Sequence, residues 1–189
     1  MNSFRCTLAR GFMIVLLASL PAASPAATYH FEGNHFTLEL PPGYQLTDQA
    51  SPMRGLMIFG FTTDRRKDGT RGLIELTLLD MKSISDPVTP EQFVESMIGG
   101  VRRRRSQWKQ RETSIEISGM RAKRIAWSGN AAPPPPGSPK QSASGMRGIM
   151  IIGMKDRTGF SLHAEDVAPY ADDTLPLCEK ALMTFHLGG

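Results

Sequence analysis

The order of strand-like and helix-like segments is the sequence feature that most constrains the fold of this chain. Phe36, Leu38 and Leu40 alternate with polar residues, which is the two-residue period of a half-buried strand. Apolar runs over 55–62 and 72–79 have the composition of further strands, and turn-forming residues separate them. Strands joined by short turns pair in antiparallel fashion, so this part of the chain predicts an antiparallel sheet.

A helix is predicted after the third of these runs. Thr89 is a plausible N-cap, Pro90 fits the first helical position, and Gln92 stands where a capping box requires it. The apolar residues that follow recur at helical spacing: Phe93, Met97, Ile98 and Val101. The chain therefore changes from strands to a helix near residue 89.

The second half repeats this order. Strands are predicted over 113–117, 120–127, 147–155 and 160–165. A final helix is predicted from about Thr174, with one apolar stripe: Leu177, Cys178, Ala181, Leu182 and Phe185. Strands, helix, strands and helix with hairpin connections predict an α+β domain, in which a largely antiparallel β-sheet is packed by two helices.

The N-terminal segment, residues 1–27, has the composition of a cleavable signal peptide. Arg5 and Arg10 precede an apolar core over 12–20, and small residues follow Pro21. The core is far shorter than the roughly 20 apolar residues that cross a membrane. We expect cleavage after Ala26 or Ala27 and export of the remaining chain.

Removal of this segment changes the charge and the thiol content. It takes away two of the 22 basic residues and none of the 18 acidic ones, so residues 28–189 are nearly neutral and do not predict nucleic-acid binding. It also removes Cys6, which leaves Cys178 without an intramolecular partner and predicts a buried thiol. The length suits a single domain, and the absence of an Asn-x-Ser/Thr site favours a bacterial periplasmic or extracellular protein.

A family resemblance enters at the first strand. The run Phe36-Thr37-Leu38-Glu39-Leu40-Pro41-Pro42-Gly43-Tyr44 resembles the opening of PsbP-like domains. These include the photosystem II extrinsic protein, exported bacterial relatives of the DcrB type and a eukaryotic Ran-binding relative. The resemblance covers residues 28–189 in element order and implies an α/β/α sandwich around an antiparallel sheet. It also implies an accessory or binding module rather than an enzyme.

A basic run is the most conspicuous candidate site. Clustered guanidinium groups bind phosphates, and a neighbouring tryptophan can stack or lie at a membrane interface. An anionic lipid headgroup, a lipopolysaccharide phosphate or an acidic partner would suit an exported protein. The alternative is a solvated helix end, where positive charge is favourable. The residues of this possible anionic contact are Arg102, Arg103, Arg104, Arg105, Trp108, Lys109 and Arg111.

Three other features have weaker functional interpretations. Met146, Met150 and Met154 lie on a predicted strand at about 13 Å intervals, too far apart to share one copper ion, and are expected to line one face. A metal site is conceivable near the end of the last strand, where His163 and Glu165 share a face and further acids follow: Asp166, Asp172 and Asp173. The prolines of the predicted loop over 130–144 favour a surface connection over a partner-binding polyproline helix.

The sequence contains no local motif for nucleophilic, zinc or phosphate-loop chemistry, and it predicts no catalytic residue, metal or cofactor. The first functional hypothesis is an exported, monomeric, non-catalytic accessory or binding module of the cell envelope, which contacts a protein partner or an anionic surface. Two alternatives remain open. One is a small-ligand carrier with an apolar pocket between sheet and helix, and the other is a hydrolase without a local motif.

Overall fold

The computed structural model describes residues 27–31, 36–84, 88–131 and 145–188. The predicted signal peptide, except for Ala27, lies outside the described residues, as does the proline tract of the predicted loop. No helix within the described ranges is both long and apolar enough to cross a membrane.

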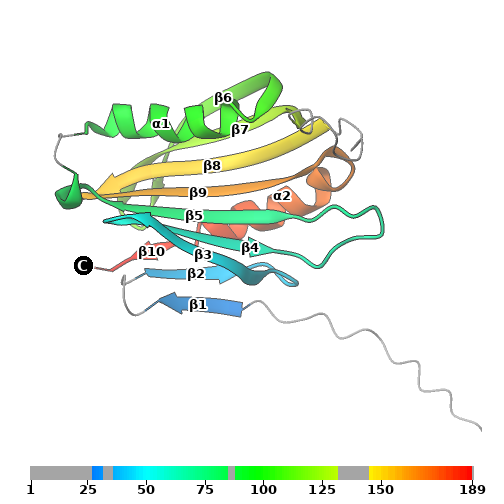
Figure 1. The fold of residues 1–189 in the computed structure, drawn as a ribbon, viewed down its shortest axis with the longest axis horizontal. Coiled ribbons are helices and arrows are strands. Elements are labelled where there is room, and N and C mark those ends of the chain that lie inside the picture. Colours follow the sequence, from blue (N-terminus) through cyan, green and yellow to red (C-terminus); the bar gives the residue numbers. More distant parts are fainter. Residues whose placement is uncertain (1–26, 32–35, 85–87, 132–144, 189) are drawn as a thin grey trace, which may run out of the picture.

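A seven-stranded antiparallel sheet forms the centre of the molecule (Figure 1). A smaller antiparallel sheet of three strands lies beside it. The strands of the large sheet, in spatial order, are β3 (Gln45–Met53), β4 (Leu56–Thr62), β5 (Leu73–Asp80), β9 (Thr158–Val167), β8 (Gly145–Lys155), β7 (Met120–Ala131) and β6 (Arg105–Ile117). The strands of the small sheet are β1 (Ala27–Phe31), β2 (Phe36–Leu40) and β10 (His186–Leu187).

Two helices cover opposite faces of the large sheet. Helix α1 (Pro90–Arg102) lies on one face, and α2 (Ala168–Leu182) lies with the small sheet on the other. A short 3-10 helix, η2 (Met81–Ser83), follows β5. The predicted α+β class, with an antiparallel sheet packed by two helices, is confirmed.

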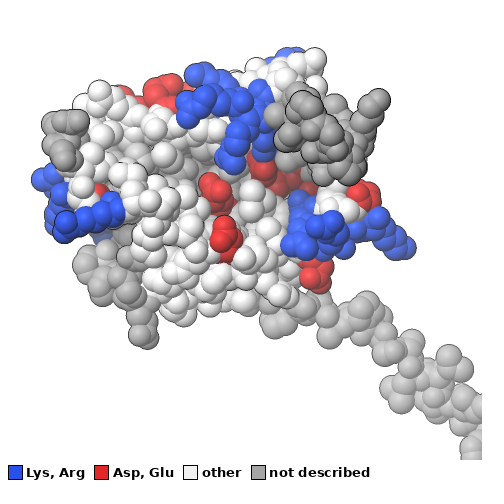
Figure 2. Space-filling view, in the orientation of Figure 1, with Lys and Arg blue, Asp and Glu red and all other residues white. Residues whose placement is uncertain are grey.

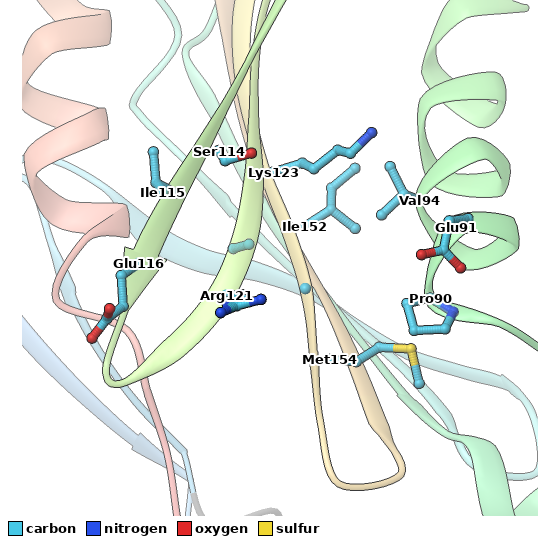
Figure 3. Close-up of a pocket in the computed structure, with 12 residues that line it drawn as sticks. Pro90, Glu91, Val94, Ser114, Ile115, Glu116, Arg121, Lys123, Ile152 and Met154 are labelled. Atoms are coloured by element: carbon cyan, nitrogen blue, oxygen red, sulfur yellow. The ribbon is translucent and has the colours of Figure 1, made fainter.

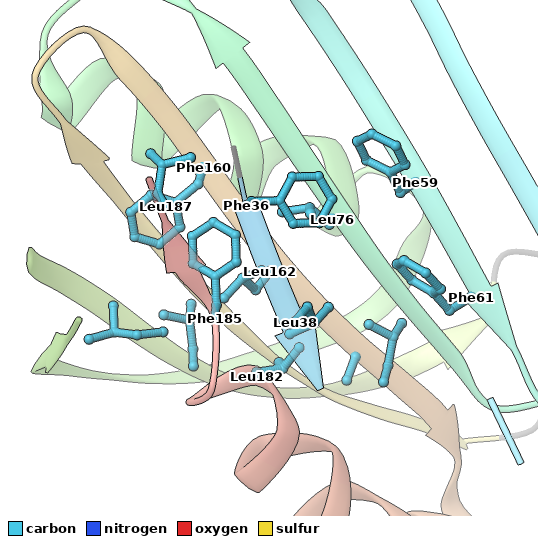
Figure 4. Packing of buried hydrophobic residues seen from close by; sticks show 14 of the residues in the cluster. Phe36, Leu38, Phe59, Phe61, Leu76, Phe160, Leu162, Leu182, Phe185 and Leu187 are labelled. Atoms are coloured by element: carbon cyan, nitrogen blue, oxygen red, sulfur yellow. The ribbon is translucent and has the colours of Figure 1, made fainter. Parts of the chain in front are cut away.

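The larger core lies between the large sheet and the layer of α2 and the small sheet (Figure 4). Phe59 and Phe61 of β4 are fully buried there. Phe36 of β2 meets Phe59 with ring centroids 5.2 Å apart, and Phe160 meets Phe185 at 5.1 Å. Each such side chain contributes about 1.5–3 kcal/mol by leaving water, so this layer supplies much of the hydrophobic stabilisation.

The smaller core lies beneath α1. The predicted capping box is present, since Gln92 N–H donates to the Thr89 hydroxyl and Thr89 N–H donates to the Gln92 carboxamide. The predicted methionine face is also confirmed, because Met150 is buried in this core while Met146 and Met154 pack at its margin. The buried residues of the cluster are Met81, Phe93, Val94, Ile98, Val101, Ile125, Trp127, Met150 and Ile152.

A buried ion pair fastens the β4–β5 connection to the start of α2. Arg66 donates two hydrogen bonds of 2.6 Å to the carboxylate of Asp166, whose side chain is 1% exposed. The Thr174 hydroxyl donates to the same carboxylate at 2.8 Å, and the Tyr170 ring lies 4.1 Å from the Arg66 guanidinium. Both oxygens of the Asp166 carboxylate therefore accept hydrogen bonds that stabilise the fold.

The predicted burial of Cys178 is confirmed. Its thiol lies 3.3 Å from the Tyr44 hydroxyl, and burial raises the pKa of the thiol to about 11. A thiol with such a pKa carries little thiolate at neutral pH, so Cys178 is a packing residue in this structure.

Several elements differ from the sequence prediction. Strand β3 was not predicted, because most of its residues are exposed and polar. Strand β6 begins at Arg105 rather than near residue 113, and its first half is likewise exposed. Helix α2 begins at Ala168 rather than near Thr174, since its N-cap is Val167, which makes no side-chain capping bond, and Pro176 lies inside the helix.

Candidate functional site

The face of the sheet that carries α1 is much wider than the helix. A helix with its side chains is about 10–12 Å across, whereas seven strands at about 4.8 Å spacing span about 29 Å. The sheet is therefore uncovered on both flanks of α1. One flank, over β6–β8, forms a hollow that we call the groove, and the other, over β4, β5 and β9, forms a smaller hollow that we call the pocket.

The groove has a volume of about 710 Å³ (Figure 3). Pro90, Glu91 and Val94 from the first turns of α1 form one wall, and Ile152 and Met154 of β8 face them. The remaining lining residues come from the β6–β7 hairpin and from β8: Ser114, Ile115, Glu116, Arg121, Ala122, Lys123 and Gly153.

The groove combines an apolar floor, formed by Ile152 and Met154 of β8, with a charged rim. Ile115 and Ala122 border the groove, but their side chains pack in the larger core on the other face. Its rim carries both signs, with Glu91 and Glu116 as acids and Arg121 and Lys123 as bases. Within the described residues, β6 pairs with β7 on one side and ends the sheet on the other, so the groove adjoins a free strand edge. An apolar floor with a polar rim next to a free edge is the arrangement that extended peptide segments use for binding.

The pocket has a volume of about 190 Å³ and a polar floor. Glu75 of β5 lies directly opposite His163 of β9 in the strand register, and Thr77 lies opposite Ser161. These four side chains form a square on the sheet beneath α1. Its other lining residues are Leu56, Ile58, Ser96, Met97, Gly100, Val101, Arg104 and Met150.

His163 is the most deeply buried member of the square, with 2% of its surface exposed. Neither ring nitrogen has a hydrogen-bond partner, and the carboxylate oxygen Oε2 of Glu165 lies 3.5 Å from Nε2. Burial lowers the pKa of His163 to about 4, although Glu165 opposes the shift. The imidazole is therefore neutral at physiological pH, with one donor and one acceptor nitrogen.

Glu75 is half-buried, and its carboxylate makes neither a hydrogen bond nor an ion pair with any described residue. Burial raises its pKa; Arg104 opposes this shift, whereas Glu165 and Asp48 add to it. A carboxylate in this position loses hydration without gaining a partner, which is costly.

The predicted basic run is divided between several environments. Arg102, Arg103 and Arg104 are exposed at the end of α1, and Arg104 also lines the pocket. Its Nε donates to the Gly100 carbonyl at 3.3 Å. Arg105 turns inward and pairs with Glu165 at 2.5 Å. Part of the run therefore has a structural role.

The other three residues of the run lie in β6. Trp108 stacks on Trp127 with ring centroids 4.8 Å apart. Lys109 and Arg111 are exposed and point to the opposite face of the sheet, because they share the side of Ile115, which packs against the larger core. Figure 2 shows the basic side chains on the viewed face in separate groups, with acidic side chains between them.

The structure brings His163 and Glu165 onto one face, as predicted, but their surroundings do not form a metal centre. No group of three histidine, cysteine, aspartate or glutamate side chains within the described ranges is placed to hold an ion. Sequence reasoning missed Glu75, Thr77 and Ser161, because they join His163 only through the pairing of β5 with β9. The signal in the sequence was the alternation of these polar residues with apolar ones in both strands.

Several solved structures share this fold. PsbP (CyanoP) from Synechocystis sp. PCC 6803 matches with a TM-score of 0.56 and 9% identity, over 91% of this chain and 99% of that one. LpqN from Mycobacterium tuberculosis, involved in cell envelope biogenesis, matches with a TM-score of 0.52 and 11% identity, over 89% and 88%. The protein of unknown function PA94 from Pseudomonas aeruginosa has a TM-score of 0.51 and 11% identity, over 87% and 98%.

At the level of sequence, no family model matches the chain, and no curated protein does so either. Identities of this size show a shared fold only. The implied α/β/α architecture is nevertheless confirmed over most of the chain, which has a PsbP-like fold.

Proposed function

We propose that this chain is an exported, non-catalytic accessory module of the cell envelope that binds a partner protein in the groove beside α1. The groove is the observation that carries the proposal. Its volume of about 710 Å³ lies within the range of specific binding sites, and its apolar floor and two-signed rim suit a polypeptide. An extended segment could also hydrogen-bond to the free edge of β6.

The envelope part of the proposal has two supports. One is the signal-peptide composition of residues 1–27. The other is the fold shared with LpqN, which is involved in cell envelope biogenesis. Accessory binding is also what the resemblance to PsbP-like domains implies.

A pair of neighbouring positions in β6 tests the proposal. Ser114 lines the groove, whereas Thr113 points to the opposite face, where it lies across from Arg124, which is bound to Glu179 of α2. A photo-reactive amino acid at Ser114, in the exported protein, should cross-link to one envelope protein, identified by mass spectrometry. The same group at Thr113 should not yield that product.

A charge change at the rim provides a second test of this proposal. Lys123→Glu should lower the yield of the Ser114 cross-link, because it inverts one rim charge without changing the apolar floor. Equal cross-linking from Ser114 and Thr113, or a yield insensitive to Lys123→Glu, would exclude the groove as the binding surface.

A second candidate function is contact with an anionic surface. The observation that favours it is the exposure of Arg102 and Arg103 at the end of α1. Replacing both with Gln should then reduce co-sedimentation with anionic phospholipid vesicles, and added salt should reduce it further. The matched control replaces Arg65 and Lys67 in the β4–β5 connection, which removes the same charge elsewhere. Equal loss with both variants would indicate a net-charge effect without a specific surface.

A further inference from the structure

The polar square on the floor of the pocket lacks protein partners. Both nitrogens of His163 are unpaired, and the Glu75 carboxylate forms no hydrogen bond with the described part of the chain. The hydroxyls of Thr77 and Ser161 stand beside them on neighbouring strands. Buried polar groups are almost always hydrogen-bonded to protein, water or a ligand, so unpaired ones beside a hollow favour a bound polar occupant there.

The chemistry of the square favours a donor-rich cation. It offers two carboxylate oxygens and two hydroxyl oxygens as acceptors, whereas both ring nitrogens of His163 are buried beneath the pocket surface. An ammonium group has three donors and no acceptor, so it can donate to the carboxylate and to both hydroxyls at once. A carboxylate as ligand would instead meet Glu75 with a like charge.

The charge of the pocket floor also favours a cationic ligand. Glu165 is neutralised by Arg105, and Arg104 lies at the exposed rim, where water screens its charge. Among the charges that act on Glu75, Arg104 is basic, and Glu165 and Asp48 are acidic. Glu75 is the one acidic side chain of the four on the floor, so the floor is negative while Arg104 makes the rim positive.

The size and the walls of the pocket define the rest of the ligand. A volume of about 190 Å³ equals the space of about six water molecules, and it is smaller than sites for drug-sized ligands. Leu56, Ile58, Met97 and Met150 provide apolar walls. Ser96 and Gly100 of α1 are small, so the helix leaves this space open above the sheet.

We propose that the pocket binds an alkylammonium group, with the Glu75 carboxylate and the Thr77 and Ser161 hydroxyls holding the ammonium and the apolar walls holding the hydrocarbon stem. The group could belong to a small free amine or to a lysine side chain of a bound protein. The pocket and the groove lie on opposite flanks of α1, so this inference does not rest on partner binding in the groove.

Titration of the folded protein with n-butylammonium chloride tests the inference, with His163 ring and backbone amide resonances as the NMR readout. We expect saturable shifts at millimolar concentrations around Glu75, Ser161 and His163. Butanol, which has the same stem without the charge, should leave these resonances unchanged. A short acetylated peptide with one central lysine distinguishes the two sources, since a response to it supports a lysine side chain and a response to butylammonium alone supports a free amine.

Two variants make the test specific. Glu75→Gln keeps the shape of the side chain, removes a half-buried charge and should weaken butylammonium binding about tenfold or more. Glu112→Gln is the matched control, because Glu112 lies in the same row across the sheet but outside the pocket, and it should bind as the unmodified protein does. The proposal is overturned if neither amine shifts the pocket resonances, if Glu75→Gln binds unchanged, or if Zn²⁺ but not butylammonium occupies the site.

Discussion

The imidazole of His163 is neutral in the folded protein because burial lowers its pKa to about 4. In the unfolded chain it would take up a proton near its usual pKa of about 6.5. Between these values the unfolded state binds more protons than the folded state, so the free energy of unfolding falls as pH falls from about 6.5 to about 4. Glu75 acts in the opposite direction, because its pKa is raised in the folded state.

The variant His163→Gln should therefore flatten the pH dependence of stability. As pH falls across this range, the free energy of unfolding of the unmodified protein should decrease by up to about 3 kcal/mol more than that of the variant. Urea unfolding at several pH values measures this difference. The contribution of Glu75 is common to both proteins and cancels. His186→Gln, at an exposed position in β10, is the control and should preserve the slope. Parallel curves for His163→Gln and the unmodified protein would contradict a neutral, buried His163.

Gly148 makes space for the Trp127 ring. A Cβ atom at this position would lie 2.4 Å from the ring, whereas a Cβ at Gly145 of the same strand would make an ordinary 3.5 Å contact. Gly148→Ala should cost about 1–3 kcal/mol of stability by overpacking. It should also alter the near-ultraviolet circular dichroism, because the two tryptophans of the chain are the stacked pair Trp108 and Trp127. Gly145→Ala is the control, and an equal loss in both variants would refute the steric explanation.

The pocket shows which part of the site could be predicted from the sequence and which could not. His163 and Glu165 could be placed on one strand face from their spacing. Their partner Glu75 could not be identified, because register between strands distant in sequence depends on the whole sheet. Polar residues that alternate with apolar ones usually indicate a solvated face, and here that face lies beneath a helix.

At the scale of elements, local chemistry decided what could be predicted. The start of α1 was recognisable because Thr89, Pro90 and Gln92 form a capping box in consecutive sequence. The edge strands β3 and β6 could not be fully identified, since a strand at the border of a sheet buries few side chains and shows little apolar alternation. The start of α2 was missed for a related reason, because Val167 makes no side-chain cap.

The capping box gives a prediction for α1. Thr89→Ala should remove the hydrogen bond to Gln92 N–H and cost about 1 kcal/mol. The first turns of the helix form a wall of the groove. Loss of the cap should make their amides exchange with deuterium roughly fivefold faster, if these turns open by local fraying. Thr113→Ala, at an exposed position in β6, should leave the exchange of α1 unchanged. Unaltered protection of the first turn in Thr89→Ala would show that packing on the sheet, without the cap, holds this end.

At the scale of the whole molecule, the predicted export has a consequence for the first strand. The register of β1 begins with Ala27 opposite Leu40, so the predicted cleavage positions lie at the start of the strand. We expect the exported protein to begin at Ala27 or Thr28, which keeps β1 paired with β2. Intact-mass spectrometry of protein from the periplasm or the medium measures this end. An N-terminus at Met1 in either fraction would rule out cleavage, and a start beyond Phe31 would show that β1 is dispensable.

Helix α1 is a shared wall between the groove and the pocket, because Val94 faces one and Ser96, Met97 and Gly100 face the other. A lateral displacement of the helix that widens one hollow narrows the other. Occupants of the two hollows would therefore be linked thermodynamically, and each would change the affinity of the other by the same factor. In that case α1 couples the two binding equilibria.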